Sequence, residues 1–199
     1  MFGSKLIEEF DSKYSGKIRV MQGWGYKYVS TGFWTQSGGI IKDVWQPVFK
    51  KVHPQKNKTW LILGLATGTV AKLIPKPVKI IGVEIDPIMI DIGKKYFALD
   101  QIPNLKIVIK DANGYLQTTN DHFDFILVDL YLGDQIPKFV HSSKFLKNLR
   151  TVGKVVVFNH LFHSEVQKKS TLDLQGKLEK YFTSVTSIRS LTNLLLICQ

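Results

Sequence analysis

An apolar segment that runs into a glycine-containing turn constrains the fold of this chain more than any other feature. The segment begins at residue 59, and the turn reads Gly64-Leu65-Ala66-Thr67-Gly68-Thr69. A second apolar segment ends in Glu84, twenty residues after Gly64. In a doubly wound sheet, such a turn holds a nucleoside, and a carboxylate at the end of the next strand accepts hydrogen bonds from the ribose hydroxyls. We therefore predict a binding site for an adenosine-containing ligand.

Strands and helices alternate along residues 55–199. Continuous apolar segments predict strands at 59–64, 78–84, 105–109, 123–129 and 154–159, a pattern typical of a parallel sheet covered on both faces. Helices are predicted between them, near 68–73, 87–98, 112–118, 138–149 and 164–181. The tail, 182–188 and 193–197, favours an antiparallel hairpin. The predicted fold class is α/β, a Rossmann-like, mostly parallel sheet with an antiparallel C-terminal strand.

The N-terminal part predicts a small appendage. Residues 17–35 have the pattern of a β-hairpin, and apolar positions from Ile40 to Val52 recur at helical spacing until His53-Pro54 ends the helix. We expect residues 1–54 to form this hairpin-and-helix appendage and residues 55–199 to form the adenosyl-binding catalytic domain.

Composition restricts the function classes. The chain has 199 residues, a formal charge of +11 and a single cysteine, Cys198, so an intrachain disulfide is excluded. Neither a membrane-spanning apolar run nor a signal-peptide pattern is present, and we expect a cytoplasmic protein. The charge is compatible with nucleic acid binding, but no basic stripe interleaved with aromatic residues supports it. A solvated, lysine-rich surface is the favoured interpretation.

Three successive predicted strands lead into acids: Glu84, Asp111 and Asp129. Ligands of open α/β sheets bind beyond the carboxyl ends of the strands, so we expect these acids on one rim beside the glycine turn. Asp111 has a second interpretation as a helix N-cap. The loop after the fourth strand adds Tyr131 and Asp134, and a cluster of acids there would attract a cationic amine.

Histidines near the fifth strand raise a further possibility. His160 and His163 have the spacing of a metal pair, but the sequence offers no convergent further ligands, and we predict no metal. His160 is instead expected to line an acceptor pocket. No Ser/His/Asp or Cys/His nucleophile set is apparent.

The order of these motifs resembles the spermidine synthase (polyamine aminopropyltransferase) family, a branch of the class I S-adenosylmethionine-dependent methyltransferase fold. The resemblance rests on 35–39, 63–68, 82–86, 110–112 and 123–129. It implies that Glu84 holds the donor ribose, that Asp111 and Ala112 face the adenine, and that Asp129 lies beside the attacking amine. The cofactor-binding candidates are Gly64, Ala66, Thr67, Gly68, Glu84, Ile85, Asp111, Ala112 and Asp129. The catalytic and acceptor-binding candidates are Asp129, Tyr131, Asp134, Gln36 and His160.

The chain also departs from the family pattern. Thr67 stands where the family has an aspartate that binds the aminopropyl end of the donor, and the N-terminal β domain is expected to be reduced to one hairpin. The leading prediction is transfer of an aminopropyl group from decarboxylated S-adenosylmethionine to a small-molecule amine. The alternatives are an S-adenosylmethionine-dependent methyltransferase and a non-catalytic nucleoside-binding protein. A homodimer is a further expectation from the resemblance.

Overall fold

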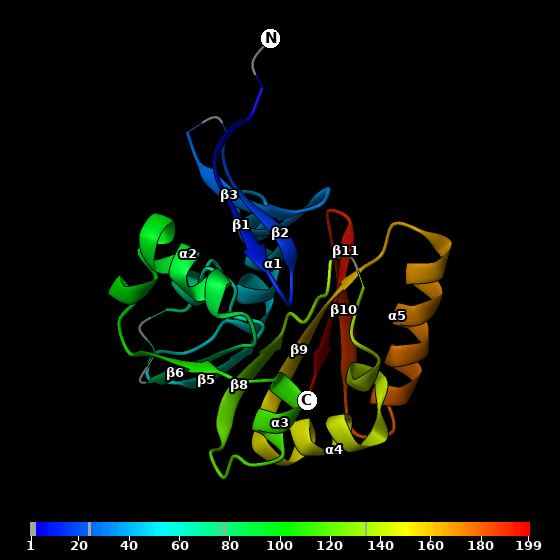
Figure 1. The fold of residues 1–199 in the computed structure, drawn as a ribbon. Coiled ribbons are helices and arrows are strands. Elements are labelled where there is room, and N and C mark those ends of the chain that lie inside the picture. The colour runs from blue at the N-terminus through cyan, green and yellow to red at the C-terminus, as the bar shows by residue number, and fades with distance from the viewer. Residues whose placement is uncertain (1–2, 24, 76, 78, 134) are drawn as a thin grey trace.

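The computed structural model describes residues 3–23, 25–75, 77, 79–133 and 135–199. These residues form a seven-stranded sheet flanked by helices and a separate four-stranded antiparallel sheet at the N-terminus (Figure 1). The predicted α/β class is confirmed. Among the described residues, no helix is long and apolar enough to cross a membrane.

The large sheet has the strand order β10-β11-β9-β8-β5-β6-β7. Its strands are β5 (Thr59–Leu63), β6 (Lys79–Glu84), β7 (Leu105–Ile109), β8 (Phe123–Val128), β9 (Gly153–Leu161), β10 (Val185–Ser190) and β11 (Asn193–Cys198). β5 pairs in parallel with both β6 and β8, whereas β11 runs antiparallel to β9 and β10. The chain order reverses on the two sides of β5, so the glycine turn after β5 lies at the topological switch point, where ligands of such sheets bind.

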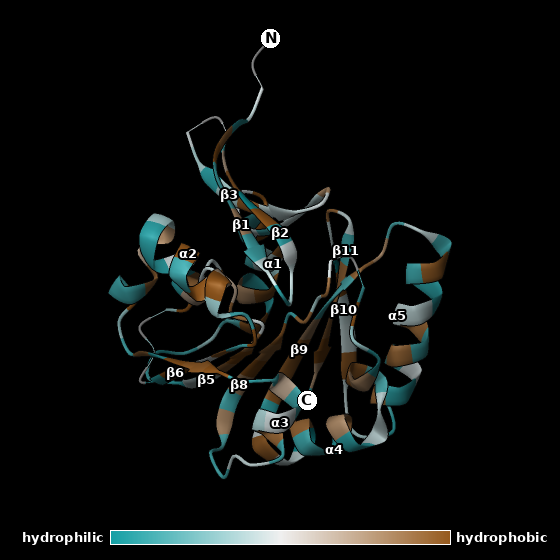
Figure 2. Ribbon diagram, in the orientation of Figure 1, coloured by the Kyte–Doolittle hydropathy of each residue, from teal (hydrophilic) through white to brown (hydrophobic). Residues whose placement is uncertain are grey.

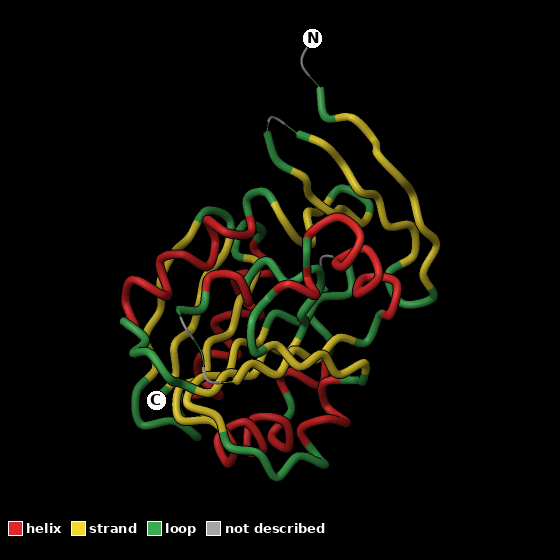
Figure 3. Tube along the Cα trace, turned by 90° about the vertical axis from the view of Figure 1, so that its left-hand side faces the viewer, coloured by secondary structure: helices red, strands yellow, loops and turns green. Residues whose placement is uncertain are grey.

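Alternate residues of one strand point to opposite faces of this sheet. Both faces are buried, because helices pack on each of them. Leu61 and Leu63 belong to a core with α3 (Ala112–Leu116), α4 (Ser143–Val152) and α5 (Glu165–Leu178). Trp60 and Ile62 belong to a second core with α1 (Ile41–Val52) and α2 (Pro87–Phe97). The central strands β8 and β9 are largely brown in Figure 2 and the outer faces of the helices are largely teal, as this arrangement requires. Figure 3 shows helices on both sides of the strands.

Side-chain caps begin most of the helices. Asp86 accepts from the Ile88 N–H with Pro87 following it, and Ser164 forms a capping box with Gln167. The predicted helix at 68–73 is instead a turn followed by a short 3-10 helix, Ala71–Leu73, because Gly68 adopts the left-handed region with φ +85°. The predicted helix at 138–149 is likewise divided, since Ser142 ends a 3-10 turn (Lys138–His141) and caps α4.

The N-terminal sheet is larger than the single predicted hairpin. The hairpin is present as β2 (Gly16–Gln22) and β3 (Lys27–Thr31), with β1 (Lys5–Ser12) and β4 (Trp34–Gly38) added on its two sides. β1 is mostly exposed and β4 is short, so neither carries a clear apolar alternation. This sheet packs on α2 through Ile18, Val20 and Val29. The division after residue 54 stays a prediction, although Trp45 of α1 packs in the same core as Trp60 of β5.

Candidate active site

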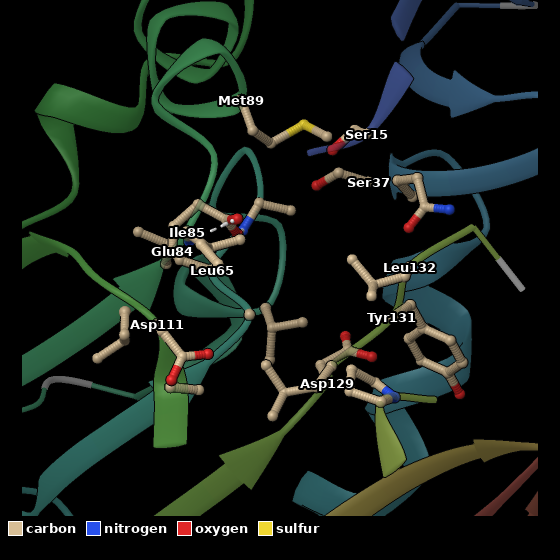
Figure 4. Close-up of a pocket in the computed structure, with 18 of the residues that line it drawn as sticks. Ser15, Ser37, Leu65, Glu84, Ile85, Met89, Asp111, Asp129, Tyr131 and Leu132 are labelled. Carbon is tan, nitrogen blue, oxygen red and sulfur yellow. Dashed lines mark hydrogen bonds between the residues drawn. The ribbon is translucent and has the colours of Figure 1, made fainter. Parts of the chain in front are cut away.

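A cleft lies at the carboxyl ends of β5, β6 and β8, between them and the N-terminal sheet. Figure 4 shows Glu84 and Asp111 on one side of it and Asp129 and Tyr131 on the other, with Ser15, Ser37 and Met89 across the opening. Seven of the nine predicted cofactor-binding residues line this cleft: Gly64, Ala66, Glu84, Ile85, Asp111, Ala112 and Asp129. The predicted rim residues Glu84, Asp111 and Asp129 therefore lie in one cleft at the carboxyl ends of the strands, as the topological switch-point rule predicts.

The start of the glycine turn has no room for a side chain. Gly64 has φ +90°, and a Cβ placed there would lie 2.1 Å from the carbonyl oxygen of Asp129. The backbone N–H groups of Gly64 and Leu65 both donate to the carbonyl of Val83, at 3.0 and 3.1 Å. Glycine is needed here because the ends of β5 and β8 are in direct contact.

Two predicted cofactor residues of the turn lie outside the cleft lining. We expected Gly68 to approach the ligand, but a Cβ on Gly68 would instead meet Leu99 Cδ1 at 2.5 Å. Packing against the segment after α2 thus accounts for this glycine. Thr67 is fully buried, and its hydroxyl donates to Ser37 Oγ at 2.7 Å. Ser37 is also hydrogen-bonded to Thr69 Oγ1 at 2.8 Å, so a chain of hydroxyls joins the turn to β4.

Glu84 is held by the backbone around it. One carboxylate oxygen accepts from the Ala66 N–H at 2.8 Å, and the other accepts from the N–H groups of Ile85 and Asp86 at 2.9 and 3.0 Å. Burial raises the pKa of this carboxyl, and the three backbone donors oppose that rise. A carboxylate has about four acceptor positions. The three backbone bonds leave the free position on Oε2, the oxygen that accepts from Ala66.

Asp111 is the N-cap of a helix, as one of the two interpretations predicted, and it also lies at the cleft. Its Oδ1 accepts from the Gly114 N–H at 2.7 Å and caps α3, while the residue also lines the cleft beside Ala112. The carboxylate therefore stabilises its helix and remains available to a ligand through its second oxygen.

Asp129 lies at the end of β8 and accepts a hydrogen bond on each oxygen. Trp45 of α1 donates its indole N–H at 3.0 Å, and Asn159 of β9 donates its amide at 2.9 Å. Asn193 of β11 donates in turn to Asn159 Oδ1 at 2.8 Å, which fixes the orientation of that amide. Burial raises the pKa of Asp129 to about 6, and the two donors oppose the rise. A carboxylate with this pKa is mostly ionised at neutral pH and able to accept a proton.

Two of the acceptor-side candidates, Tyr131 and Gln36, line the cleft. Tyr131 lines the cleft and donates its hydroxyl to the Asn159 carbonyl at 2.8 Å, and burial places its pKa well above the usual value. Gln36 also lines the cleft and donates to Thr31 Oγ1 and to the Gly133 carbonyl at 2.9 and 3.0 Å, joining β4 to the loop after β8. Asp134 lies outside the described residues.

His160 does not lie where the sequence analysis placed it. It is 2 % exposed, absent from the cleft lining, and hydrogen-bonded to Thr171 of α5 at 3.4 Å. Burial, with His141 nearby, lowers the pKa of its imidazole to about 3. Within the described part of the chain, no group of three or more His, Cys, Asp or Glu side chains is placed to hold a metal ion.

Several residues of the site were not among the sequence candidates. Trp45 was covered only by the apolar helical pattern from Ile40 to Val52, and neither Asn159 nor Asn193 was singled out. Ser12 and Ser15 of the N-terminal sheet both donate to Asp86 Oδ2 at 2.6 Å, which fixes the turn that carries Ser15 over the cleft. The rule that ligands bind at strand ends would have indicated the end of the fifth predicted strand, but it does not decide between the neighbours Asn159 and His160.

The known proteins that this chain resembles in sequence include polyamine aminopropyl transferases and methyltransferase homologs. A probable polyamine aminopropyl transferase of Bifidobacterium longum is 35% identical over 106 residues, which are 50% of this chain and 23% of the relative. A homolog of the eEF1A lysine and N-terminal methyltransferase from Drosophila pseudoobscura pseudoobscura is 28% identical over 154 residues, 69% of this chain and 22% of the relative. The chain thus matches less than a quarter of the length of either protein.

A solved structure gives the same fold over nearly the whole chain. A spermidine synthase in complex with the transition-state analogue AdoDATO superposes with a TM-score of 0.79, covering 98% of this chain and 73% of that one at 16% identity. The Spermine/spermidine synthase domain model matches residues 46–196. Because that match runs from α1 to β11 and includes the carboxyl ends of β5, β6 and β8, the chain belongs to the spermine/spermidine synthase family.

Proposed function

We propose that this protein is a transferase that moves an aminopropyl group from decarboxylated S-adenosylmethionine to an amine. The observation that carries the proposal is Asp129, a carboxylate at the end of β8 that faces the cleft while two neutral donors hold both of its oxygens. Membership of the spermine/spermidine synthase family supports the reaction class.

The opposite side of the cleft fits the nucleoside of such a donor. Glu84 retains a free acceptor position for a ribose hydroxyl, and Asp111 with Ala112 offers a polar edge and an apolar surface for the base. The neighbour with AdoDATO and the human methyltransferase-like protein 13 in complex with SAH, which superposes with a TM-score of 0.60 at 23% identity, bind their ligands on the same fold. Leu65, Ile85 and Met89 supply the apolar surface that encloses most small-molecule ligands.

The donor would supply an electrophilic carbon next to a sulfonium that leaves as a neutral thioether. The amine nitrogen forms the new C–N bond with its lone pair, and the electrons of the broken C–S bond remain on sulfur. Asp129 orients the amine and accepts the proton that nitrogen loses, an effect typically worth about 10²–10⁴ in rate. Trp45 and Asn159 keep the carboxylate in a fixed orientation, because each oxygen is held by a separate donor.

Methyl transfer from S-adenosylmethionine is the second candidate, and Thr67 favours it. The family aspartate for the aminopropyl end is replaced here by a buried hydroxyl hydrogen-bonded to Ser37. This part of the turn therefore offers no carboxylate to a donor amine. The methyltransferase homolog that matches 69% of the chain also supports this alternative.

The coproduct separates the candidates. Purified protein is incubated with an amine panel and either donor, and the nucleoside product is identified by mass spectrometry. Aminopropyl transfer releases methylthioadenosine, and methyl transfer releases S-adenosylhomocysteine. Release of methylthioadenosine only with the decarboxylated donor and an amine would support the proposal. Donor binding by calorimetry with neither coproduct would leave the non-catalytic nucleoside-binding function and refute the transferase.

A further inference from the structure

A second cavity lies on the far side of Asp129 from the nucleoside end of the cleft. It is formed by β4, α1, the ends of β8 and β9, and the β10–β11 turn. Asp129, Tyr131, Gln36 and Ile41 line both the cleft and this cavity. An amine that attacks a donor in the cleft from the Asp129 side would therefore extend into the second cavity.

Polar and apolar side chains both line the cavity, and the polar residues Tyr131, Asn159 and Asn193 belong to the hydrogen-bonded group around Asp129. Trp34, Ile41, Val44 and Leu161 contribute to its walls. Among its lining residues that the structure describes, Asp129 carries the only charge. The cleft differs, because Glu84, Asp111 and Lys110 line it in addition to Asp129. The two ends of the site therefore favour different chemistry.

Exposed apolar side chains surround the cavity mouth. Phe33, Ile40 and Leu191 line it and are 103 %, 50 % and 52 % exposed. Leu191 adopts the left-handed region with φ 52°, a conformation that residues other than glycine seldom adopt. The apolar character thus continues from Asp129 to the surface, and a ligand there would remove these side chains from water.

On the basis of the proposed function, we propose that this cavity receives the acceptor and selects a primary amine carried on an apolar chain over a diamine of equal length. The reacting nitrogen lies at Asp129, and its methylene groups contact Trp34, Ile41 and Leu161. A second ammonium at the far end would lie beside Phe33, Ile40 and Leu191, where the described lining residues offer no second carboxylate to pair with it. A terminal methyl group at that point gains from the same burial.

Hexan-1-amine and pentane-1,5-diamine test this selection, because they have the same number of heavy atoms and differ in one terminal group. Each is assayed with the donor that gives turnover, and kcat/KM is compared at fixed pH. We expect at least a tenfold preference for hexan-1-amine. Equal values, or a preference for the diamine, would overturn the inference and leave the transferase proposal intact.

A charge introduced at the mouth should change the selection. Ile40→Glu places a carboxylate on the rim just before α1, where an acid is compatible with a helix N-terminus. We expect the kcat/KM ratio to shift at least fivefold towards the diamine. Val166→Glu, on a side chain of α5 that is 79 % exposed and outside the cavity lining, serves as the matched control and should leave the ratio unchanged. A shift of equal size in both variants would also contradict the inference.

Binding separates this inference from the proposed function. Calorimetry with each amine in the presence of methylthioadenosine requires no turnover. Tighter binding of hexan-1-amine without any coproduct would retain the inference and reject the transferase. Failure of both amines to bind would overturn the inference, whatever the donor does.

Discussion

The raised pKa of Asp129 makes the stability of the protein depend on pH in a way that Asp129→Asn should remove. Burial raises the pKa of this carboxyl to about 6 in the folded protein, against an ordinary value of 3.8. Between these values the unfolded chain releases the proton and the folded protein retains it. The contribution of Asp129 protonation to the free energy of unfolding is therefore fully present below about pH 4 and is lost as the pH rises through about 6.

The size of the effect follows from the shift. About two pKa units correspond to about 3 kcal/mol in total, of which about 2 kcal/mol falls between pH 4.5 and pH 8. Asparagine has no such titration. It also presents an N–H group to either Trp45 or Asn159, both of which donate to Asp129, and this mismatch costs about 1–3 kcal/mol. That cost is the same at every pH, so the pH dependence isolates the ionisation.

Urea unfolding of both proteins across pH 4.5 to 8 provides the measurement. The free energy of unfolding of the variant minus that of the wild type should rise with pH by about 2 kcal/mol and level off above pH 7. A difference that is flat, or that falls with pH, would refute the assignment of a raised pKa. In turnover assays, wild-type kcat should fall below about pH 6 as Asp129 becomes protonated, and the variant should lose about 10²–10⁴ in rate. A variant with normal turnover would reject Asp129 as the proton acceptor.

Three further variants test other parts of the site. Glu84→Gln should weaken binding of an adenosyl ligand tenfold or more in calorimetry, because hydrogen bonds to a charged group are worth about 1.5–3 kcal/mol; unchanged affinity would remove its assigned role. Gly64→Ala should lower the free energy of unfolding by about 2–4 kcal/mol, since its Cβ would meet the Asp129 carbonyl; Gly133→Ala, also at positive φ but in open space, is the control, and an equal loss would refute the steric argument. Trp45→Phe removes one donor to Asp129 and should raise the midpoint of the kcat–pH profile; a lowered midpoint would contradict this role.

The sequence was sufficient to predict the backbone frame of the site. Continuous apolar segments predicted the parallel sheet, and the rule that ligands bind beyond the carboxyl ends of strands placed the glycine turn, Glu84 and Asp129 at one edge, as the structure has them. These features follow from local pattern and a general rule of sheet topology. The two added N-terminal strands lacked such a pattern, because β1 is mostly exposed and β4 has only five residues.

Side-chain partners were less accessible to sequence reasoning. Trp45 reaches Asp129 across 84 positions of sequence, and no local pattern encodes that contact. Asn159 and His160 are neighbours on one strand, so their side chains point to opposite faces of the sheet. The register of the strand decides which of the two faces the site. Asn159 contacts Asp129, whereas His160 contacts Thr171 of α5 on the other side of the sheet. A strand predicted without its register could not tell which of the two belonged to the site.

Thr67 extends this argument from position to chemistry. Its place in the turn resembles that of a family aspartate that binds the donor, yet its side chain is buried and hydrogen-bonded to Ser37. Thr69 completes the chain of hydroxyls by bonding Ser37 and the Gly38 N–H of β4. A carboxylate in this buried position would lose its hydration and add charge to a set of neutral partners. The threonine therefore joins the turn to the N-terminal sheet. In the proposed transferase we expect contacts to the transferred group from the opposite wall of the cleft, where Asp129 is held by Trp45 and Asn159.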